Sequence, residues 1–234
     1  MVIPPPPRMP ENGNYAPGPA IVNEPPSSFL IVMNITNIIT QLLLGAVTCC
    51  AIITANFYLP FNGTAFSTHI YLCVIGYVVL MTQAILSLSP FTGWSNTFKH
   101  QDKKTIHLVM QIIGSILAIT GSMIRIFNVA AHFQSAHGSL GILALIFTCL
   151  SLIGGVANLY SHRLGVDPKF IIIGHACFGC ITIILPFLAL IFAFDSNLYR
   201  GTFPQTANMA ITFTVLALVG TLMAACLNMV RRFK

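Results

Sequence analysis

Residues 170–194 read FIIIGHACFGCITIILPFLALIFAF and contain no Asp, Glu, Lys or Arg. A helix that crosses the hydrocarbon core of a bilayer needs about 20 predominantly apolar residues. The stretch is therefore long enough and apolar enough to predict a membrane span. Other charge-free stretches of similar or greater length cover 25–98, 105–124, 126–162 and 201–230.

The composition of the whole chain leads to the same prediction. Hydrophobic residues make up 56% of the 234 residues and charged residues only 7%, whereas a soluble domain carries about 25% charged residues. A chain of this size cannot hide so much apolar surface in one aqueous core, so its solvent is a lipid bilayer. The net charge is +6, but the basic residues lie at span ends instead of in one patch, which excludes a nucleic-acid partner.

Six spans and two tails follow from the apolar stretches and the Pro- and Gly-containing breakers between them. Residues 1–28 hold nine of the 14 prolines and predict a disordered cytosolic tail. The six-span domain covers 29–230, and 231–234 form a basic cytosolic tail. The spans are predicted at 29–58, 67–89, 104–131, 137–161, 170–194 and 207–230. We therefore expect an all-α membrane protein.

The basic residues orient the spans. Six spans place both termini on one side, and the loops on that side, 90–103 and 162–169, carry four of the five Lys and Arg residues that lie in loops. Loops on the opposite side supply only Arg200. Cytosolic loops are enriched in Lys and Arg, so both termini are predicted to be cytosolic. Asn62 begins a glycosylation triplet on the outer side.

Four histidines lie near the starts of spans 2 to 5, and each is a candidate functional residue because histidine within a membrane span is costly. The separation is 68 residues from His69 to His137 and again 68 from His107 to His175. Spans 2 and 4 both run inward, so the first pair shares the outer half. Spans 3 and 5 both run outward, so the second pair shares the inner half.

Two facing imidazole pairs in a helical bundle are the arrangement that holds six-coordinate b haems. With both axial positions filled, such a haem has no open site for oxygen chemistry and transfers electrons. The positive end of each helix dipole would favour haem propionates near the surface. We predict two haems in a four-helix bundle of spans 2–5, flanked by spans 1 and 6.

Two other interpretations compete with the haem prediction. A metal-ion pathway generally needs carboxylates or thiolates beside histidine, and the spans contain no Asp or Glu. A haem-free membrane transporter or scaffold is the other interpretation, in which each histidine is an ordinary helix-end residue. The seven cysteines lie within apolar spans, so we interpret them as packing residues instead of disulfide partners.

Several short motifs around the histidines resemble the cytochrome b561 family, most closely its short animal D-type branch. These are Phe66-Ser67-Thr68-His69, Leu80-Met81-Thr82-Gln83-Ala84 to Ser89-Pro90, Lys103-Lys104-Thr105-Ile106-His107, Ser135-Ala136-His137-Gly138-Ser139-Leu140-Gly141 and Gly174-His175-Ala176-Cys177-Phe178-Gly179. Together they cover about spans 2 to 5. The chain departs from the family pattern at Ile70, at Gln111 and at Gln83, which stands where a relative carries Glu.

The resemblance implies a transmembrane oxidoreductase with two b haems, held by His69 with His137 and by His107 with His175. Family members typically take electrons from cytosolic ascorbate and pass them to monodehydroascorbate or ferric chelates. Reduction of ferric iron with another donor stays open. The resemblance also implies an internal membrane, of the endoplasmic reticulum or of vesicles, with the plasma membrane as the alternative. Whether the protein is a monomer or a homodimer stays open.

Basic residues near the inner haem are candidates for binding the ascorbate anion. By resemblance these are Lys103, Lys104 and Arg163, with Lys169 as a weaker candidate; the alternative for each is ordinary positive-inside charge. On the outer side, Arg125 lies 18 residues after His107, about 27 Å along a helix. It therefore reaches the outer haem level, where a propionate could pair with it, unless it extends to the interface instead. His132 is an outer substrate candidate by resemblance.

Overall fold

A computed structural model describes residues 27–163, 165 and 167–233, and within them the secondary structure is helical throughout, with no strand. Six of its helical segments are long and apolar enough to cross a membrane. The elements in chain order are α1 (Ser27–Cys73), the π-helix η1 (Val74–Met81), α2 (Thr82–Ser87), the 3-10 helix η2 (Gly93–Ser95), α3 (His100–Phe127), α4 (Ala136–Leu159), the 3-10 helix η3 (Ser161–Arg163), α5 (Pro168–Phe194), α6 (Asn197–Thr202) and α7 (Pro204–Phe233). The predicted all-α, six-span membrane fold is confirmed.

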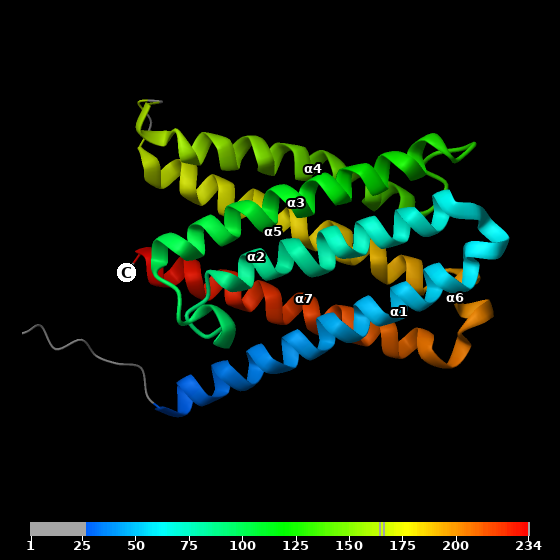
Figure 1. Cartoon of the computed structure of the whole chain (residues 1–234), viewed down its shortest axis with the longest axis horizontal. Helices are drawn as coiled ribbons and strands as arrows, with labels where there is room; N and C mark the ends of the chain where they lie inside the picture. The colour runs from blue at the N-terminus through cyan, green and yellow to red at the C-terminus, as the bar shows by residue number, and fades with distance from the viewer. Residues whose placement is uncertain (1–26, 164, 166, 234) are drawn as a thin grey trace, which may run out of the picture.

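The six segments run back and forth between two ends of the molecule (Figure 1). One end carries the start of α1, the end of α7 and the connections α2–α3 and α4–α5. The other end carries the turn between spans 1 and 2, the connection α3–α4, and α6. Large apolar side chains on the outer faces, such as Ile31, Leu42 and Ile153, are more than half exposed, as expected for helices whose solvent is lipid.

The first two spans differ from the prediction at their junction. A break was expected from Pro60 to Gly63, but α1 continues helically through Pro60 while the chain reverses direction (Figure 1). Ser67 Oγ donates to the Ala55 carbonyl at 2.8 Å, which holds the two arms together. Proline removes one backbone donor and bends a helix without having to end it, so the turn here is a sharp bend in one helical run.

The second span is also irregular in its middle. Residues 74–81 form a π-helix, and the span returns to α-helix at Thr82 before ending at Ser87. The apolar pattern of 67–89 predicts a span but says nothing about this local rewinding. π-Helical turns within α-helices are rare and frequently lie at functional sites.

Spans 4 and 5 begin at polar caps close to the predicted boundaries. Ser135 Oγ accepts a hydrogen bond from Gly138 N at 3.1 Å at the start of α4, and Asp167 accepts one from Lys169 N at 2.9 Å before α5. Such caps satisfy free backbone donors at helix N-termini. The short helix α6 was not predicted; Ser196 caps it, and Arg200 links it to Asp195 through a 2.6 Å ion pair.

Spans 1 and 6 pack along a seam of mostly small residues that repeats every seven positions, the spacing of coiled-coil seams. On α7 the buried positions are Ala207, Ala210, Thr214, Ala217 and Thr221; on α1 they are Thr40, Leu44, Val47, Ala51, Thr54 and Tyr58. Small residues let membrane helices approach closely. Gly220 is an example, because a Cβ added there would collide with the Thr40 side chain.

The predicted tails lie largely outside the described residues. Of the predicted tail 1–28, only 27 and 28 are described, and they begin α1. The backbone of α7 continues to Phe233, whereas the side chains of the predicted basic tail 231–234 are not described. The side chain of Asn62, which begins the glycosylation triplet, is likewise outside the described set.

Candidate functional site

His69 and His137 face each other in the half of the molecule that is predicted to be the outer one. His69 lies near the end of α1, in the second span, and His137 is the second residue of α4. Their ring centres are 6.1 Å apart and their planes are inclined at 82°. The two residues predicted to pair at this depth are therefore neighbours in the fold.

His107 and His175 form a second pair in the half that is predicted to be the inner one. His107 lies in the second turn of α3 and His175 in the second turn of α5. Their ring centres are 6.5 Å apart and their planes are perpendicular, at 90°. Spans 2 to 5 thus contribute one imidazole each. The imidazoles of spans 2 and 4 form one pair and those of spans 3 and 5 the other, as the spacing of 68 residues predicted.

Both separations match two imidazoles on opposite sides of one metal ion. A metal–nitrogen bond of about 2 Å, plus about 1 Å from that nitrogen to its ring centre, gives about 6 Å across the ion. Among the described residues no cluster of three or more His, Cys, Asp or Glu could hold a metal. Each pair therefore fits a metal whose other ligands come from a planar cofactor, as in a haem with two axial histidines.

Backbone carbonyls fix the protonation of three of these rings. Nδ1 of His69 lies 2.9 Å from the Gly121 carbonyl, Nδ1 of His107 lies 2.9 Å from that of Ala84, and Nδ1 of His137 lies 2.8 Å from that of Ala189. A carbonyl can only accept, so Nδ1–H is the donor in each case. In a neutral ring, Nε2 then keeps its lone pair free for a metal, and the ring orientation is set.

The outer pair repeats one local arrangement in two halves of the chain. His69 and His137 are 68 residues apart, and so are their acceptors Gly121 and Ala189. In each half a histidine near the start of one span donates to a carbonyl late in the next span. Spans 2–3 and spans 4–5 are therefore two copies of one helical hairpin in the way they orient these rings.

His175 is the one histidine of the four whose Nδ1 does not donate to a backbone carbonyl. Its Nδ1 is buried and has no hydrogen-bond partner among the described residues; the Ser151 carbonyl faces it but lies outside hydrogen-bonding geometry. Gly154 and Gly155 of α4 lie against this ring, since a Cβ added at Gly155 would stand 3.4 Å from His175 Cε1. Two adjacent glycines thus let α4 approach the imidazole closely.

A cavity of about 450 Å³ adjoins the outer pair. Both imidazoles line it, and so does Gly141, where an added Cβ would meet nothing within 4 Å. Its walls are mostly apolar, and its volume is within the range of about 300–1,000 Å³ typical of small-molecule and cofactor sites. Tyr199 of α6 also lines it, and burial raises the pKa of its hydroxyl.

Arg125 lines the same cavity, at the level predicted from its distance along α3. Its guanidinium carbon is 5.3 Å from the centre of the Phe66 ring. Among the described residues the one ion pair is Arg200 with Asp195, so no described carboxylate pairs with Arg125. A half-buried cation of this kind fits an anionic group of a cofactor in the cavity.

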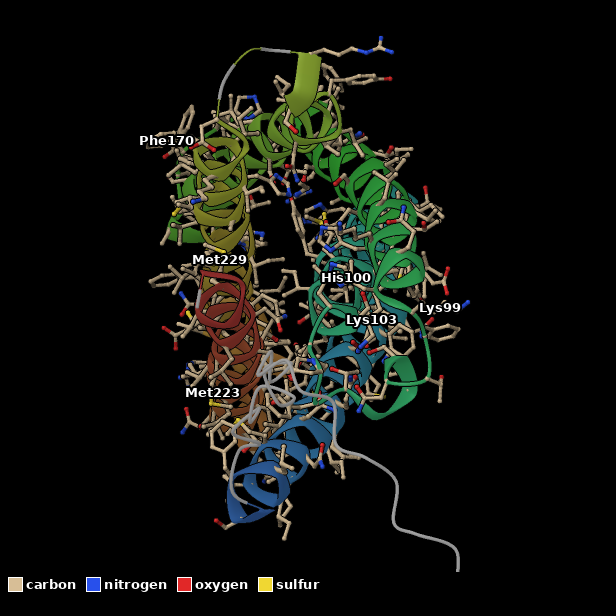
Figure 2. All side chains as sticks on the ribbon, turned by 90° about the vertical axis from the view of Figure 1, so that its left-hand side faces the viewer. Lys99, His100, Lys103, Phe170, Met223 and Met229 are labelled. Carbon is tan, nitrogen blue, oxygen red and sulfur yellow. The ribbon has the colours of Figure 1, made fainter. Side chains whose placement is uncertain are left out.

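The candidates that are predicted to be cytosolic lie at one end of the molecule but differ in exposure. Lys104, Arg163 and Lys169 are exposed, whereas Lys103 is only 9% exposed and donates from Nζ to the Ser89 carbonyl at 3.4 Å. Figure 2 shows Lys103 on the inner side of the start of α3 and Lys99 at the periphery. Lys103 therefore ties α3 to the end of the second span.

His132 lies in the exposed connection between α3 and α4 and is not among the residues that line the outer cavity. Its neighbour Phe133 adopts a positive φ of 59°, which is uncommon for a bulky residue.

Sequence reasoning missed Gly121, Ala84 and Ala189 as partners of the histidines. They act through backbone carbonyls, which leave no side-chain signal in a sequence.

Comparisons with a family model and with known proteins indicate the same family. A sequence model of eukaryotic cytochrome b561 matches residues 68–200, more than half of the chain. The human protein named transmembrane reductase CYB561D2 is 29% identical over 107 residues, which cover 44% of this chain and 48% of the human protein; the bovine protein of that name gives the same figures. The mouse protein is 27% identical over 146 residues, 60% of this chain and 66% of its own.

The chain thus spans about half the length of the human and bovine relatives that it matches. The match to the family model includes all four paired histidines and Arg125. Family membership implies haem b as the cofactor, in agreement with the fit of the two imidazole pairs. The chain belongs to the eukaryotic cytochrome b561 family.

Proposed function

We propose that this protein carries single electrons across a membrane, from cytosolic ascorbate to monodehydroascorbate or a ferric chelate on the opposite side. Two b haems supply the one-electron redox chemistry. His69 and His137 would hold the outer haem, and His107 and His175 the inner one, within a four-helix bundle of spans 2–5. The observation that carries the proposal is the spacing of the two imidazole pairs, 6.1 and 6.5 Å between ring centres.

The protein groups have a defined task in this proposal. The carbonyls of Gly121, Ala84 and Ala189 each accept a hydrogen bond from Nδ1–H of one histidine, so that its Nε2 would be free to bind the metal. Such hydrogen bonds also raise the basicity of the imidazole and tune the reduction potential. Two imidazoles per metal leave no open coordination position, which supports electron transfer over oxygen activation.

The cytosolic end supplies cations for an anionic donor. Lys104 lies three residues before His107 and Lys169 six before His175; both side chains are exposed, as is that of Arg163 in the α4–α5 connection. Ascorbate is an anion at neutral pH, so these three would attract it to the inner haem edge. Lys103, whose amine contacts Ser89, would instead hold the start of α3 in place.

The outer end supplies groups for the cofactor and for the acceptor. Arg125 would pair with a propionate of the outer haem, since it lines the cavity next to His69 and His137. His132, exposed in the adjoining connection, would contact the acceptor. We place both termini in the cytosol, and the membrane in the endoplasmic reticulum, in vesicles or at the cell surface.

The absorption spectrum of the purified full chain, with a haem-to-protein count, tests this function. We expect a red protein with two haems per chain, reducible by ascorbate and reoxidised by ferric chelate. Replacing His107 or His175 by Ala should remove one haem of the two. A colourless protein would support a haem-free transporter or scaffold, and an unchanged haem count in both variants would refute the ligand assignment.

A further inference from the structure

The second span rewinds from π-helix to α-helix between Met81 and Thr82, and side chains secure the backbone at this junction. Thr82 Oγ1 donates to the Val79 carbonyl at 3.2 Å and also contacts that of Val78. Gln111 of α3 donates from Nε2 to the Met81 carbonyl at 3.4 Å. A backbone carbonyl without a hydrogen bond is costly in a membrane. The side chains of Thr82 and Gln111 supply hydrogen bonds to the carbonyls at this junction.

The acceptor for His107 lies at the end of the same short segment. α2 ends at Ser87, and Leu88 N donates to the Ile85 carbonyl at 3.2 Å instead of to the Ala84 carbonyl, its partner in a regular α-helix. The Ala84 carbonyl accepts from Ser87 Oγ at 2.8 Å and from His107 Nδ1 at 2.9 Å. The orientation of His107 therefore depends on where residues 81–84 hold the Ala84 carbonyl.

Gln83, the residue before Ala84, anchors this segment to the first span. Its amide forms a reciprocal pair with that of Gln41 on α1: Gln41 Nε2 donates to Gln83 Oε1 at 3.1 Å, and Gln83 Nε2 donates back to Gln41 Oε1. Both side chains are partly buried within membrane spans. Burying an amide in an apolar medium without a hydrogen-bond partner is costly, so the pairing of the two glutamines stabilises this contact between the spans.

We propose that Gln41 and Gln83 are positioning residues for His107 and thereby set the properties of the inner haem. The pair fixes residue 83 against α1, this fixes the Ala84 carbonyl at the end of α2, and the carbonyl orients the His107 ring. Span 1 thus acts on a haem site to which it contributes no ligand. The inference rests on the proposed function, because it assumes a haem between His107 and His175.

The test compares Gln83→Met, Gln41→Met and the double variant in the purified full chain. Methionine is close in size to glutamine and apolar, and the double variant leaves no unpaired amide. The measurements are the haem count, the low-spin electron paramagnetic resonance signals and the midpoint potentials of the two haems. We expect a shifted signal and potential for the inner haem, or loss of that haem alone, with the outer haem unchanged.

Tyr58→Phe is the matched control, because the Tyr58 hydroxyl ties the same α1 helix to the Leu198 carbonyl at 2.8 Å in the outer half. It should leave the inner haem as in the unaltered protein. Unchanged inner-haem properties in the double variant would overturn the proposal. So would equal changes in both haems, loss of both haems, or an equal inner-haem effect of Tyr58→Phe. An unaltered protein without haem would instead refute the proposed function itself.

Discussion

The ring planes of His107 and His175 are perpendicular, at 90°, across a centre-to-centre distance of 6.5 Å. In a haem with two axial imidazoles, mutually perpendicular rings bring the iron orbitals that interact with them close in energy. The inclination is 82° in the outer pair. We therefore predict strongly anisotropic low-spin ferric signals from both haems in electron paramagnetic resonance. Signals typical of parallel imidazoles from either haem would show that its ligands are arranged differently.

Ser87→Ala should lower the midpoint potential of the inner haem. Ser87 Oγ and His107 Nδ1 share the Ala84 carbonyl, so removal of the hydroxyl leaves the carbonyl a stronger acceptor for the imidazole. A more basic imidazole stabilises the ferric state. A strengthening of about 1 kcal/mol corresponds to about 40 mV for one electron. Spectroelectrochemical titration measures the shift, and a rise in potential would contradict the shared-acceptor interpretation.

Arg125→Met should lower the potential of the outer haem or reduce its occupancy. A positive charge beside a cofactor favours the reduced state, and each kcal/mol lost corresponds to roughly 40 mV. Arg125→Lys keeps the charge and should retain most of the potential. The same redox titration resolves the two haems. An effect confined to the inner haem would show that Arg125 acts elsewhere than in the cavity that it lines.

Lys104→Ala should raise the KM for ascorbate about fivefold with little change in kcat, because an exposed cation contributes about 1 kcal/mol to anion binding. High salt should shrink the difference through screening. Lys103→Ala should instead lower thermal stability, since its amine contacts Ser89 and its stem is buried. Steady-state ascorbate oxidation and a melting curve distinguish the two roles; a KM effect of Lys103→Ala alone would reverse the assignment.

Gly76→Ala should destabilise the fold by about 1–3 kcal/mol through overpacking. A Cβ at Gly76 would stand 2.6 Å from the Gly114 carbonyl oxygen and 2.8 Å from Ala118 N, both backbone atoms that cannot move aside alone. Gly45→Ala is the control, because an added Cβ there meets nothing within 4 Å. Thermal melts in detergent should show a lower melting temperature for Gly76→Ala only.

Sequence reasoning predicted the features that depend on composition and period. The charge-free stretches predicted the six spans, because lipid demands apolar residues over a fixed length. The identical separations from His69 to His137 and from His107 to His175, combined with alternating span direction, predicted which rings meet. Both inferences use only distance along a regular helix, which a sequence encodes directly.

Features that depend on local backbone geometry could not be predicted. Helical continuation through Pro60, the π-helix of 74–81 and the acceptors of the histidine protons all depend on how neighbouring spans pack. Lys103 illustrates the same limit, because its place among the other basic residues gave no sign that its amine would reach the Ser89 carbonyl. The hydrogen-bonded pair of Gln41 and Gln83 joins residues 42 positions apart, and no periodic pattern in the sequence indicates that they meet.

The repeated hairpin has a consequence for assembly. Each imidazole pair takes one histidine from spans 2–3 and the other from spans 4–5, so neither hairpin alone contains a complete pair of axial ligands. A porphyrin bound in this way is a cross-link between the two repeats, and its binding energy also drives their docking. Fragments cut between α3 and α4 still share the seam of spans 1 and 6, so they should associate weakly when produced in haem-starved cells and more tightly once the pigment is supplied.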